Sequence, residues 1–269
     1  MPFTSHPSTL KFGGMEGLSH RGTRILQRVG DLTGNTFRTE YGLVGGTAID
    51  QVGQPLPKES LDVARKADAI LFGAVGGPKW DDPRAKTRPE DGILAIRKSL
   101  GLFANLRPVK VDAALLNSSP IKPELLHGVD MILVRELTGG LYFSRPKKRW
   151  ENSRGRRSVD TLTYTEQEIE RILRVGFELA VNRKKRLTSV DKANVLETSR
   201  LWREMATEIS KDYPDVELEH ILVDNASMQL IRQPSHFDVI VAENTFGDIL
   251  TVEASVLSGS MGMLPSASL

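Results

Sequence analysis

The chain has 269 residues, with 36 Lys and Arg against 34 Asp and Glu, and it contains no Cys. This composition excludes a disulfide scaffold, thiolate metal sites and a cysteine nucleophile. No apolar run approaches the ~18–20 residues of a membrane span, and the first twenty residues lack the apolar core of a secretory signal. We therefore expect a soluble, cytoplasmic protein without a membrane partner, and the net charge of +2 predicts no global attraction to nucleic acid.

The predicted elements alternate between helices and strands along most of the chain. Residues 1–22 show no helical or strand period and are expected to form a tail or loop. Helices are predicted at Leu61–Lys66, Ile93–Ser99 and Glu166–Arg183, and strands at Ala67–Gly77, Arg107–Val111, Met131–Glu136, Leu187–Leu196, Glu217–Val223 and Phe237–Ala242. This alternation predicts an α/β fold with a largely parallel sheet.

One local segment departs from the balanced charge. Arg145–Arg157 holds seven basic residues in thirteen, together with one Trp. Such a segment is either a patch for nucleic acid or an acidic partner, or a solvated hairpin arm between two structured segments. The near-neutral charge of the whole chain favours the hairpin arm.

Three arginines, Arg97, Arg107 and Arg135, lie on or next to predicted elements. Guanidinium groups bind carboxylates through two parallel hydrogen bonds, so three converging arginines would suit an acidic substrate. Arginines are common on ordinary surfaces, however, and the spacing alone equally allows three unrelated structural roles.

Two carboxylates and a lysine are further candidates. Asp224 and Asp248 each follow a strand-like run, where ligands bind in open α/β sheets, but either could instead cap a helix. As metal ligands they would favour Mg²⁺ or Mn²⁺ over zinc. Lys192 falls within a predicted strand, where it is either a surface residue or a base with a lowered pKa. Tyr142 follows a Gly-Gly pair and is either a proton donor or a packing residue.

Eight strings occur together and in order along the chain, and they resemble one family. With them, residues 23–269 resemble the 3-isopropylmalate dehydrogenase branch of the β-decarboxylating dehydrogenases, which include isocitrate and tartrate dehydrogenases. The strings are GGTAID (45–50), GAVGGPKW (73–80), RPEDGILAIRKS (88–99), LFANLRP (102–108), VRELTGGLYF (134–143), VDKANVL (190–196), VDNASMQL (223–230) and ENTFGDIL…EAS…GSMGMLPSAS (243–268). GAVGGPKW, and ELTGG within VRELTGGLYF, suggest a fungal source.

The resemblance implies a role for each candidate residue. Lys192 would help remove the hydroxyl proton while hydride leaves C2 for the nicotinamide, and Tyr142 would protonate the enol that follows decarboxylation. The residues implied to contact substrate are Glu90, Ile93, Leu94, Arg97, Arg107, Arg135 and Asp224. Among these, the apolar pair Ile93 and Leu94 favours a hydrocarbon substituent at C3 of the malate. The metal ligands would be Asp224 and Asp248.

The same resemblance implies the cofactors and the assembly. NAD would lie along the loop after the glycine-ended strand, at Gly77, Pro78, Lys79, Trp80, Thr87, Arg88, Pro89 and Glu90. A divalent cation, Mg²⁺ or Mn²⁺, would stabilise the enolate. In the family, Lys192 and Asp224 reach the site from the partner subunit, so a homodimer with shared active sites is implied.

Three departures from the family pattern qualify these expectations. Residues 1–22 do not match the first strand and its glycine loop, and the chain ends before the loop that holds the adenosine, so we expect a chain truncated at both ends. In GDILTVEAS, Val252 stands where the family has a second carboxylate, four residues after Asp248 on the same helical face. The third metal ligand is therefore lost, and we expect weaker metal binding.

The resulting interpretation is a two-domain fold of the isopropylmalate/isocitrate dehydrogenase type, with a parallel or mixed sheet and an incomplete first domain. The first domain would comprise 1–102 and 259–269, and the second 103–258, with an arm around 142–164. The expected activity is NAD-linked oxidative decarboxylation of 3-isopropylmalate or a related, possibly aromatic, 3-substituted malate, in leucine biosynthesis or a specialised pathway. The alternatives are a non-catalytic or partner-dependent paralogue that acts as a dimerisation subunit, and a nucleic-acid-binding module.

Overall fold

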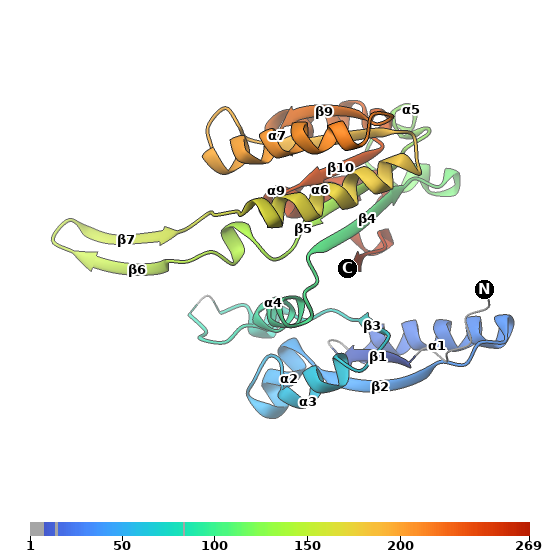
Figure 1. The fold of residues 1–269 in the computed structure, drawn as a ribbon. Helices are drawn as coiled ribbons and strands as arrows, with labels where there is room; N and C mark the ends of the chain where they lie inside the picture. The colour runs from blue at the N-terminus through green and yellow to red at the C-terminus, as the bar shows by residue number, and fades with distance from the viewer. Residues whose placement is uncertain (1–7, 14–15, 83) are drawn as a thin grey trace. The chain divides into compact units, whose positions relative to one another are not determined.

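The computed structural model describes residues 8–13, 16–82 and 84–269, and it divides the chain into two compact units (Figure 1). The first unit comprises Met1–Leu100 and the second Gly101–Leu269. No helix among the described residues is long and apolar enough to cross a membrane.

The first unit is a small α/β unit around a three-stranded parallel sheet with the order β2-β1-β3. Its elements are β1 (Ser8–Gly13), α1 (Glu16–Thr33), β2 (Arg38–Leu43), α2 (Gly45–Val52), α3 (Lys58–Ala64), β3 (Ala69–Phe72) and α4 (Pro89–Leu100). Val44, Ala64 and Ile96 form its buried core, so α4 is anchored by the face that carries Ile96.

The expectation of a tail or loop over residues 1–22 is wrong for the described part of this segment. Ser8–Gly13 is the central strand of the sheet and pairs in parallel with both β2 and β3, and α1 begins at Glu16. The six-residue strand is too short to stand out by period. Hydrogen bonding to a strand on each side, which the sequence pattern does not reveal, compensates for its length. The connection to α1, where the family has its glycine loop, includes residues 14–15, which lie outside the described residues.

The second unit is built on a six-stranded mixed sheet with the order β11-β4-β5-β10-β8-β9. The pairs that join β5, β10, β8 and β9 are parallel, whereas β4 is antiparallel to both β5 and β11. The strands are β4 (Ala104–Lys110), β5 (Asp130–Glu136), β8 (Arg186–Asp191), β9 (Glu217–Leu222), β10 (Val239–Ala242) and β11 (Ala267–Ser268). The predicted α/β fold with a parallel or mixed sheet is therefore confirmed.

Helices cover both faces of this sheet and form two apolar cores. They are α5 (Pro123–Leu126), α6 (Glu166–Val181), α7 (Glu197–Ile209), α8 (Val223–Arg232) and α9 (Asn244–Ser255). Side chains of β10 alternate between the cores: Val239 and Val241 pack with α6 and α7, whereas Ile240 and Ala242 pack with α8 and α9. The short apolar strand run is therefore buried on both faces, as parallel strands in α/β proteins are.

The predicted helix over 166–183 is confirmed as α6, and its start is encoded locally. Thr165 accepts a hydrogen bond from the backbone N–H of Glu168, and the Glu168 carboxylate accepts one from the backbone N–H of Thr165. This capping box satisfies two N–H groups that a helix otherwise leaves free. Apolar residues at spacings of three and four, including Ile169, Leu173 and Phe177, are fully buried against the sheet.

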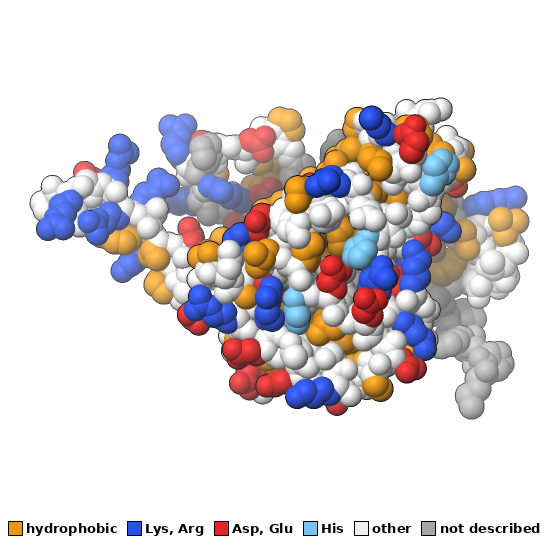
Figure 2. All heavy atoms as spheres, turned by 90° about the horizontal axis from the view of Figure 1, so that it is seen from above, with side chains coloured by type: hydrophobic (Ala, Val, Ile, Leu, Met, Phe, Trp, Pro, Cys, Tyr) orange, Lys and Arg blue, Asp and Glu red, His pale blue; other side chains and the backbone are white. Residues whose placement is uncertain are grey.

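The basic segment forms an exposed hairpin. β6 (Lys147–Asn152) pairs antiparallel with β7 (Gly155–Asp160), and the hairpin projects from the second unit (Figure 1). Figure 2 shows lysines and arginines gathered along it. The predicted hairpin arm is thus confirmed, and a nucleic-acid role for it stays untested.

The unit boundaries differ from the expected domains at residues 259–269. This segment is expected in the first domain, whereas in the structure it belongs to the second unit, Gly101–Leu269. There β11 pairs with β4, and the side-chain amide of Asn105 donates to the backbone oxygen of Ala267 (2.9 Å) and to the hydroxyl of Ser266 (2.9 Å). These contacts lie far apart in sequence, so the chain order alone does not reveal them.

Candidate active site

An ion pair between Arg135 and Asp248 is the centre of the candidate site in the second unit. Arg135 is the penultimate residue of β5, and its side chain is only 6% exposed. Its guanidinium group bonds Asp248 of α9, and its Nε and Nη2 donate to the side-chain oxygen of Asn244 (3.2 and 2.8 Å). A buried cation with these fixed partners presents its remaining donors in one direction, as a carboxylate-binding arginine requires.

Tyr142 joins this cluster from the loop after β5. It lies in a single 3-10 turn, Gly140–Tyr142, and its hydroxyl donates to the second carboxylate oxygen of Asp248 (2.9 Å). Partial burial and the bond to that carboxylate raise the pKa of the Tyr142 phenol above its ordinary value. The phenol therefore keeps its proton at neutral pH and can deliver it only to a stronger base, such as a carbanion or enolate.

Arg107 brings a second guanidinium group to the same place from β4. Its Nε donates to the side-chain oxygen of Asn105 (3.0 Å), a neutral partner. Burial and the positive charge of Arg135 lower the pKa of Arg107, and the negative charge of Asp248 opposes that shift. Asp248 bonds Arg135 and not Arg107, so the charge of the second guanidinium group is left for a bound carboxylate to neutralise.

A buried set of hydrogen bonds holds the loop that carries Tyr142. The carboxylate of Glu136, which is fully buried, accepts hydrogen bonds from the backbone N–H groups of Thr138 (2.8 Å) and Gly139 (2.7 Å). The ring of Tyr164 lies against Gly139 and Gly140, and a Cβ on Gly139 would come within 2.6 Å of it. Gly140 also has φ +72°, a conformation that favours glycine. The Gly-Gly pair is therefore required by the path of the loop.

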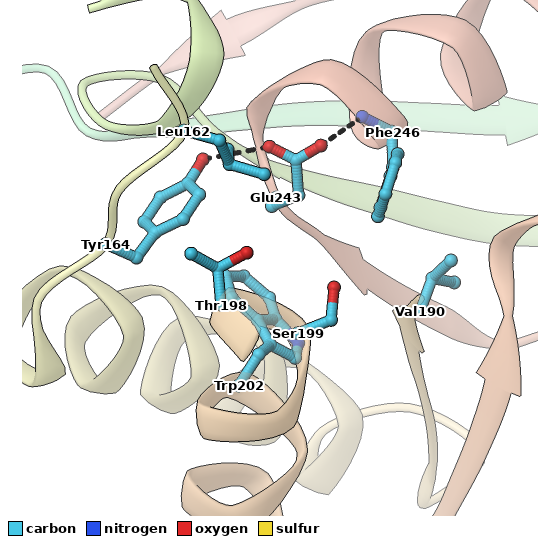
Figure 3. Close-up of a pocket in the computed structure, with 8 residues that line it drawn as sticks. All are labelled: Leu162, Tyr164, Val190, Thr198, Ser199, Trp202, Glu243 and Phe246. Carbon is cyan, nitrogen blue, oxygen red and sulfur yellow. Dashed lines mark hydrogen bonds between the residues drawn. The ribbon is translucent and has the colours of Figure 1, made fainter. Parts of the chain in front are cut away.

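The same tyrosine contacts the start of α9, which carries Asp248. Figure 3 shows Tyr164, Glu243 and Phe246 around a small pocket, with Tyr164 donating to Glu243 (3.1 Å) and Glu243 accepting from the backbone N–H of Phe246 (2.7 Å). Glu243 therefore caps α9. Asp248 lies one turn further along, so the alternative that it caps this helix is excluded.

Lys192 and Asp224 form a second pair, with 2.6 Å between Nζ and Oδ1. The hydrogen bond from Lys192 lowers the pKa of Asp224. The Asp224 side chain is 65% exposed and lies in the first turn of α8, whose preceding residue, Leu222, occupies the N-cap position. Asp224 is therefore not the N-cap of its helix.

The prediction that Lys192 lies inside a strand is wrong, because β8 ends at Asp191. The Asp191 carboxylate accepts from the backbone N–H of Ala193 (2.9 Å) and from two nitrogens of Arg203 (2.7 and 2.9 Å). A side chain that bonds the backbone two residues ahead starts a turn, so the apolar run continues in sequence but not as a strand. Lys192 is the first residue of that turn.

In the first unit, the four residues expected to face the substrate share one side of α4. Glu90, Ile93, Leu94 and Arg97 recur at the spacings that place side chains on a common helix face. The buried residues of α4 are Pro89, Gly92 and Ile96, which belong to a different face. The four candidates are thus left out of the core of their own unit.

The loop expected to contact NAD is held by an aspartate that sequence analysis does not identify. Lys79 and Trp80 lie in a short 3-10 turn, Pro78–Trp80, after β3, and both donate to Asp50 of α2 (2.6 and 3.3 Å). The bond from Lys79 lowers the pKa of Asp50. A Cβ on Gly46 would lie 2.5 Å from the Trp80 ring, so glycine is needed there. Thr87 and Arg88 are exposed and immediately precede α4.

The carboxylates of the site fit a divalent cation in chemistry but are few. Asp224 and Asp248 offer the oxygen ligands that Mg²⁺ and Mn²⁺ prefer. Val252, one turn after Asp248 on α9, is 46% exposed and contributes no oxygen from its side chain. Within the part of the chain that the structure describes, no three His, Cys, Asp or Glu side chains gather closely enough to hold a metal ion.

Residues that position the site are what sequence reasoning missed. The string ENTFGD, the start of the last matched string, contains Glu243, Asn244 and Gly247, but the resemblance implies no separate role for any of the three. Tyr164 carries no local signal, because its hydrogen-bond partners lie 28 to 80 residues away in sequence. Glu136 falls within the matched string 134–143, but no role is predicted for it.

Comparison with known proteins shows the family to which the chain belongs. The sequence model of the isocitrate/isopropylmalate dehydrogenase family matches residues 14–269, so the chain belongs to that family. The 3-isopropylmalate dehydrogenase of Dehalococcoides mccartyi strain CBDB1 is 59% identical over 249 residues, which cover 92% of this chain and 68% of the relative. That of Geobacillus kaustophilus is 61% identical, with coverage of 91% and 66%. The chain thus spans about two thirds of the length of these relatives.

Solved structures place the chain in the same family. An isocitrate dehydrogenase from Methylococcus capsulatus superposes with a TM-score of 0.83 at 30% identity and covers 98% of this chain, which covers 74% of that protein. A β-decarboxylating dehydrogenase from Thermococcus kodakarensis gives a TM-score of 0.73 at 32% identity, with coverage of 98% and 72%. The expected family membership is confirmed, and the fungal source stays a prediction.

Proposed function

We propose that the chain catalyses the NAD-linked oxidative decarboxylation of 3-isopropylmalate or a closely related 3-substituted malate. The observation that carries the proposal is the cluster of Arg107, Arg135, Tyr142 and Asp248, which puts two carboxylate-binding groups beside a protonated phenol. The close relatives named 3-isopropylmalate dehydrogenase support the substrate class. They also support the place of the reaction in leucine biosynthesis and favour the dehydrogenase over the non-catalytic alternative.

Arg107 and Arg135 bind and orient the malate. A dicarboxylate that enters the cluster accepts hydrogen bonds from both guanidinium groups and neutralises their excess charge. Fixing the acid in one orientation supplies a large part of the rate, because the bond to be broken is then held in a productive geometry. Lys192, as a neutral amine, would take the hydroxyl proton, which is the role that the resemblance implies for it, and its bond to Asp224 holds Nζ in place.

Tyr142 would hold the proton that the product requires. Its raised pKa keeps the phenol protonated until decarboxylation leaves negative charge on the substrate. The hydrogen bond to Asp248 directs the hydroxyl toward the acidic centre of the cluster. Tyr142 would then protonate the enol.

Two groups that the chain does not itself supply complete the chemistry. NAD accepts the hydride, and a divalent cation supplies Lewis-acid stabilisation of negative charge on substrate oxygens. Asp248, with Asp224 of a second copy, would hold the cation. The Pro78–Trp80 turn and the residues from Thr87 to Glu90 would contact the dinucleotide. The loss of a carboxylate at Val252 predicts that this cation binds weakly.

We further propose that the chain forms a homodimer through α8 and α9. These two helices pack on each other, and Ser227 of α8 donates to Glu253 of α9 (2.9 Å). Their outer surface exposes Met228 (47%), Ile249 (58%) and Val252 (46%). An apolar patch formed by two neighbouring helices favours a partner with the same surface, because a twofold axis lets each patch cover the other. Asp224 lies on one of these helices, which suits a site shared between copies.

The substituent at C3 would be read by α4. Ile93 and Leu94 offer an apolar surface beside Glu90 on a face that the core does not use. An apolar surface of this kind would discriminate by only ~1–3 kcal/mol per missing methylene, so a larger apolar substituent would also be accepted. Isocitrate, whose C3 substituent is a carboxymethyl group, would be disfavoured.

The test is a coupled assay of NADH formation with 3-isopropylmalate, 3-benzylmalate and isocitrate, each with and without Mn²⁺. We expect turnover with at least one of the two apolar malates, only in the presence of Mn²⁺, and little with isocitrate. Absence of turnover with all three substrates would refute the proposed activity. Turnover confined to isocitrate would refute the assignment of α4.

A further inference from the structure

Asn244 connects the three elements that carry the candidate residues. It is the first residue of α9, 1% exposed, and its side-chain oxygen accepts from Nε and Nη2 of Arg135 (3.2 and 2.8 Å). Its side-chain nitrogen donates to the backbone oxygen of Gly139 (3.2 Å), in the loop that leads to Tyr142. Its backbone N–H donates to the hydroxyl of Tyr164 (3.0 Å). The side-chain amide of Asn244 thus contacts β5 and the loop after it, while its backbone N–H contacts the buried Tyr164.

The chemistry of the amide matters more than its size. Arg135 offers only donors, whereas the Gly139 carbonyl offers only an acceptor. A side chain between them must therefore accept on one side and donate on the other, which Asn does within its short length. A carboxylate would satisfy Arg135 but would oppose the carbonyl oxygen of Gly139, and an aliphatic residue would leave both partners unsatisfied in a buried place.

We propose that Asn244 is the positioning residue that fixes the guanidinium group of Arg135 and ties it to the loop of Tyr142. The inference rests on the proposed function, in which Arg135 binds a substrate carboxylate. Two of the guanidinium nitrogens are held by Asn244 and the third bonds Asp248, so the group cannot rotate about its last torsion without losing bonds. Without Asn244, Arg135 keeps its charge and its pairing with Asp248 but loses its fixed orientation.

The experiment reads the geometry of Arg135 directly, in the full chain. The Nε–Hε signal of Arg135 is identified in the nitrogen-15 NMR spectrum by its disappearance in Arg135→Lys. We expect this proton to exchange slowly with water in the unaltered protein, and about tenfold faster or more in Asn244→Ala, because its acceptor is gone. Asn244→Asp keeps the acceptor and should keep the slow exchange. Asn244→Ser replaces the Ala variant if the latter is unfolded.

The matched control is Thr245→Val at the next position of α9. The Thr245 hydroxyl is buried and has no hydrogen-bond partner among the described residues, so its removal should leave Arg135 unchanged. Unaltered exchange at Arg135 in Asn244→Ala, or equal acceleration in Thr245→Val, would overturn the proposal. If Asn244 had a merely structural role, its loss would accelerate proton exchange at backbone amides throughout the unit as well as at Arg135. That result would also count against the proposal.

Calorimetric titration with 3-isopropylmalate in the presence of Mg²⁺ adds the functional consequence. We expect Asn244→Ala to weaken binding about 10- to 100-fold, Asn244→Asp to weaken it less, and Thr245→Val to leave it unchanged. If the unaltered protein does not bind the malate, the proposed substrate fails, and the exchange of Arg135 still decides the role of Asn244. If the malate binds equally to the unaltered and Ala proteins, the positioning role is refuted while the substrate stands.

Discussion

Gly247 is the position where the structure makes the sharpest prediction. The side chain of Arg135 crosses α9 at this residue, and a Cβ built on Gly247 would lie 2.7 Å from Cγ and 2.8 Å from Cβ of Arg135. Real Cβ contacts are essentially never this close, so Gly247→Ala forces a shift. Arg135 cannot give way at its flexible end, because its guanidinium group is bonded to Asn244 and Asp248.

Two costs follow from this clash. Overpacking a buried contact lowers the free energy of unfolding by ~1–3 kcal/mol. Displacement of Arg135 also breaks charge-assisted hydrogen bonds, so the affinity for a malate should fall by about 10- to 100-fold. Urea denaturation gives the first quantity and calorimetric titration with 3-isopropylmalate gives the second.

A second glycine provides the control. At Gly262 a Cβ would meet only the Ser260 hydroxyl, at an ordinary 3.7 Å, so Gly262→Ala should change neither quantity. A Gly247→Ala protein as stable as the unaltered chain, with the same affinity for the malate, would refute the reasoning that Arg135 is immobile. Equal losses of stability and affinity in both variants would show instead that the reduced backbone flexibility of alanine, and not the contact with Arg135, causes the effect.

Three further changes test other parts of the molecule. Val252→Asp places a carboxylate one turn from Asp248 and should tighten Mn²⁺ binding about tenfold or more, measured by paramagnetic resonance. The control Val252→Leu should leave the affinity for Mn²⁺ unchanged. An unchanged affinity in Val252→Asp would show that position 252 does not face the cation. Burial raises the pKa of Glu243 above its ordinary 4.5, so the folded chain binds this proton more tightly than the unfolded chain. The contribution to the free energy of unfolding is therefore full below pH 4.5 and falls as pH rises through the folded pKa. Glu243→Gln should remove this fall, so that its stability to urea changes less with pH above 4.5 than that of the unaltered chain. Asp50→Asn removes the partner of Lys79 and Trp80 and should shift the tryptophan emission. It should weaken dinucleotide binding by at most about fivefold, because the ion pair between Lys79 and Asp50 is exposed. A loss of folding would instead assign Asp50 to the core.

Local signals in the sequence account for most of the elements. The predicted helix over 166–183 is correct because capping and apolar period are both encoded within twenty residues, at Thr165, Glu168 and the positions that follow. The buried strand β10 (Val239–Ala242) is recognisable for a similar reason, since an apolar run of this length suits a strand covered on both faces. In both cases the residues that determine the element lie within it or next to it in the sequence.

The errors arise where distant residues decide the structure. The strand Ser8–Gly13 depends on β2 and β3 on either side, and the end of β8 depends on the pairing of Asp191 with Arg203. The contact of Arg135 with Asp248 spans 113 positions and that of Arg135 with Asn244 spans 109. Sequence motifs identified Arg135 and Asp248 but could not reveal that each neutralises the other, nor that Asn244 holds the guanidinium group.

The division of the chain into two units separates two kinds of sequence change, those at the proposed specificity residues and those at the proposed catalytic cluster. The proposed reader of the C3 substituent is one face of α4, in the first unit, whereas the arginine, tyrosine and aspartate cluster belongs to the second. The hydrogen bonds described for the cluster join residues of the second unit alone. A change on that face of α4 is therefore expected to alter the proposed substrate preference while every residue of the cluster stays the same.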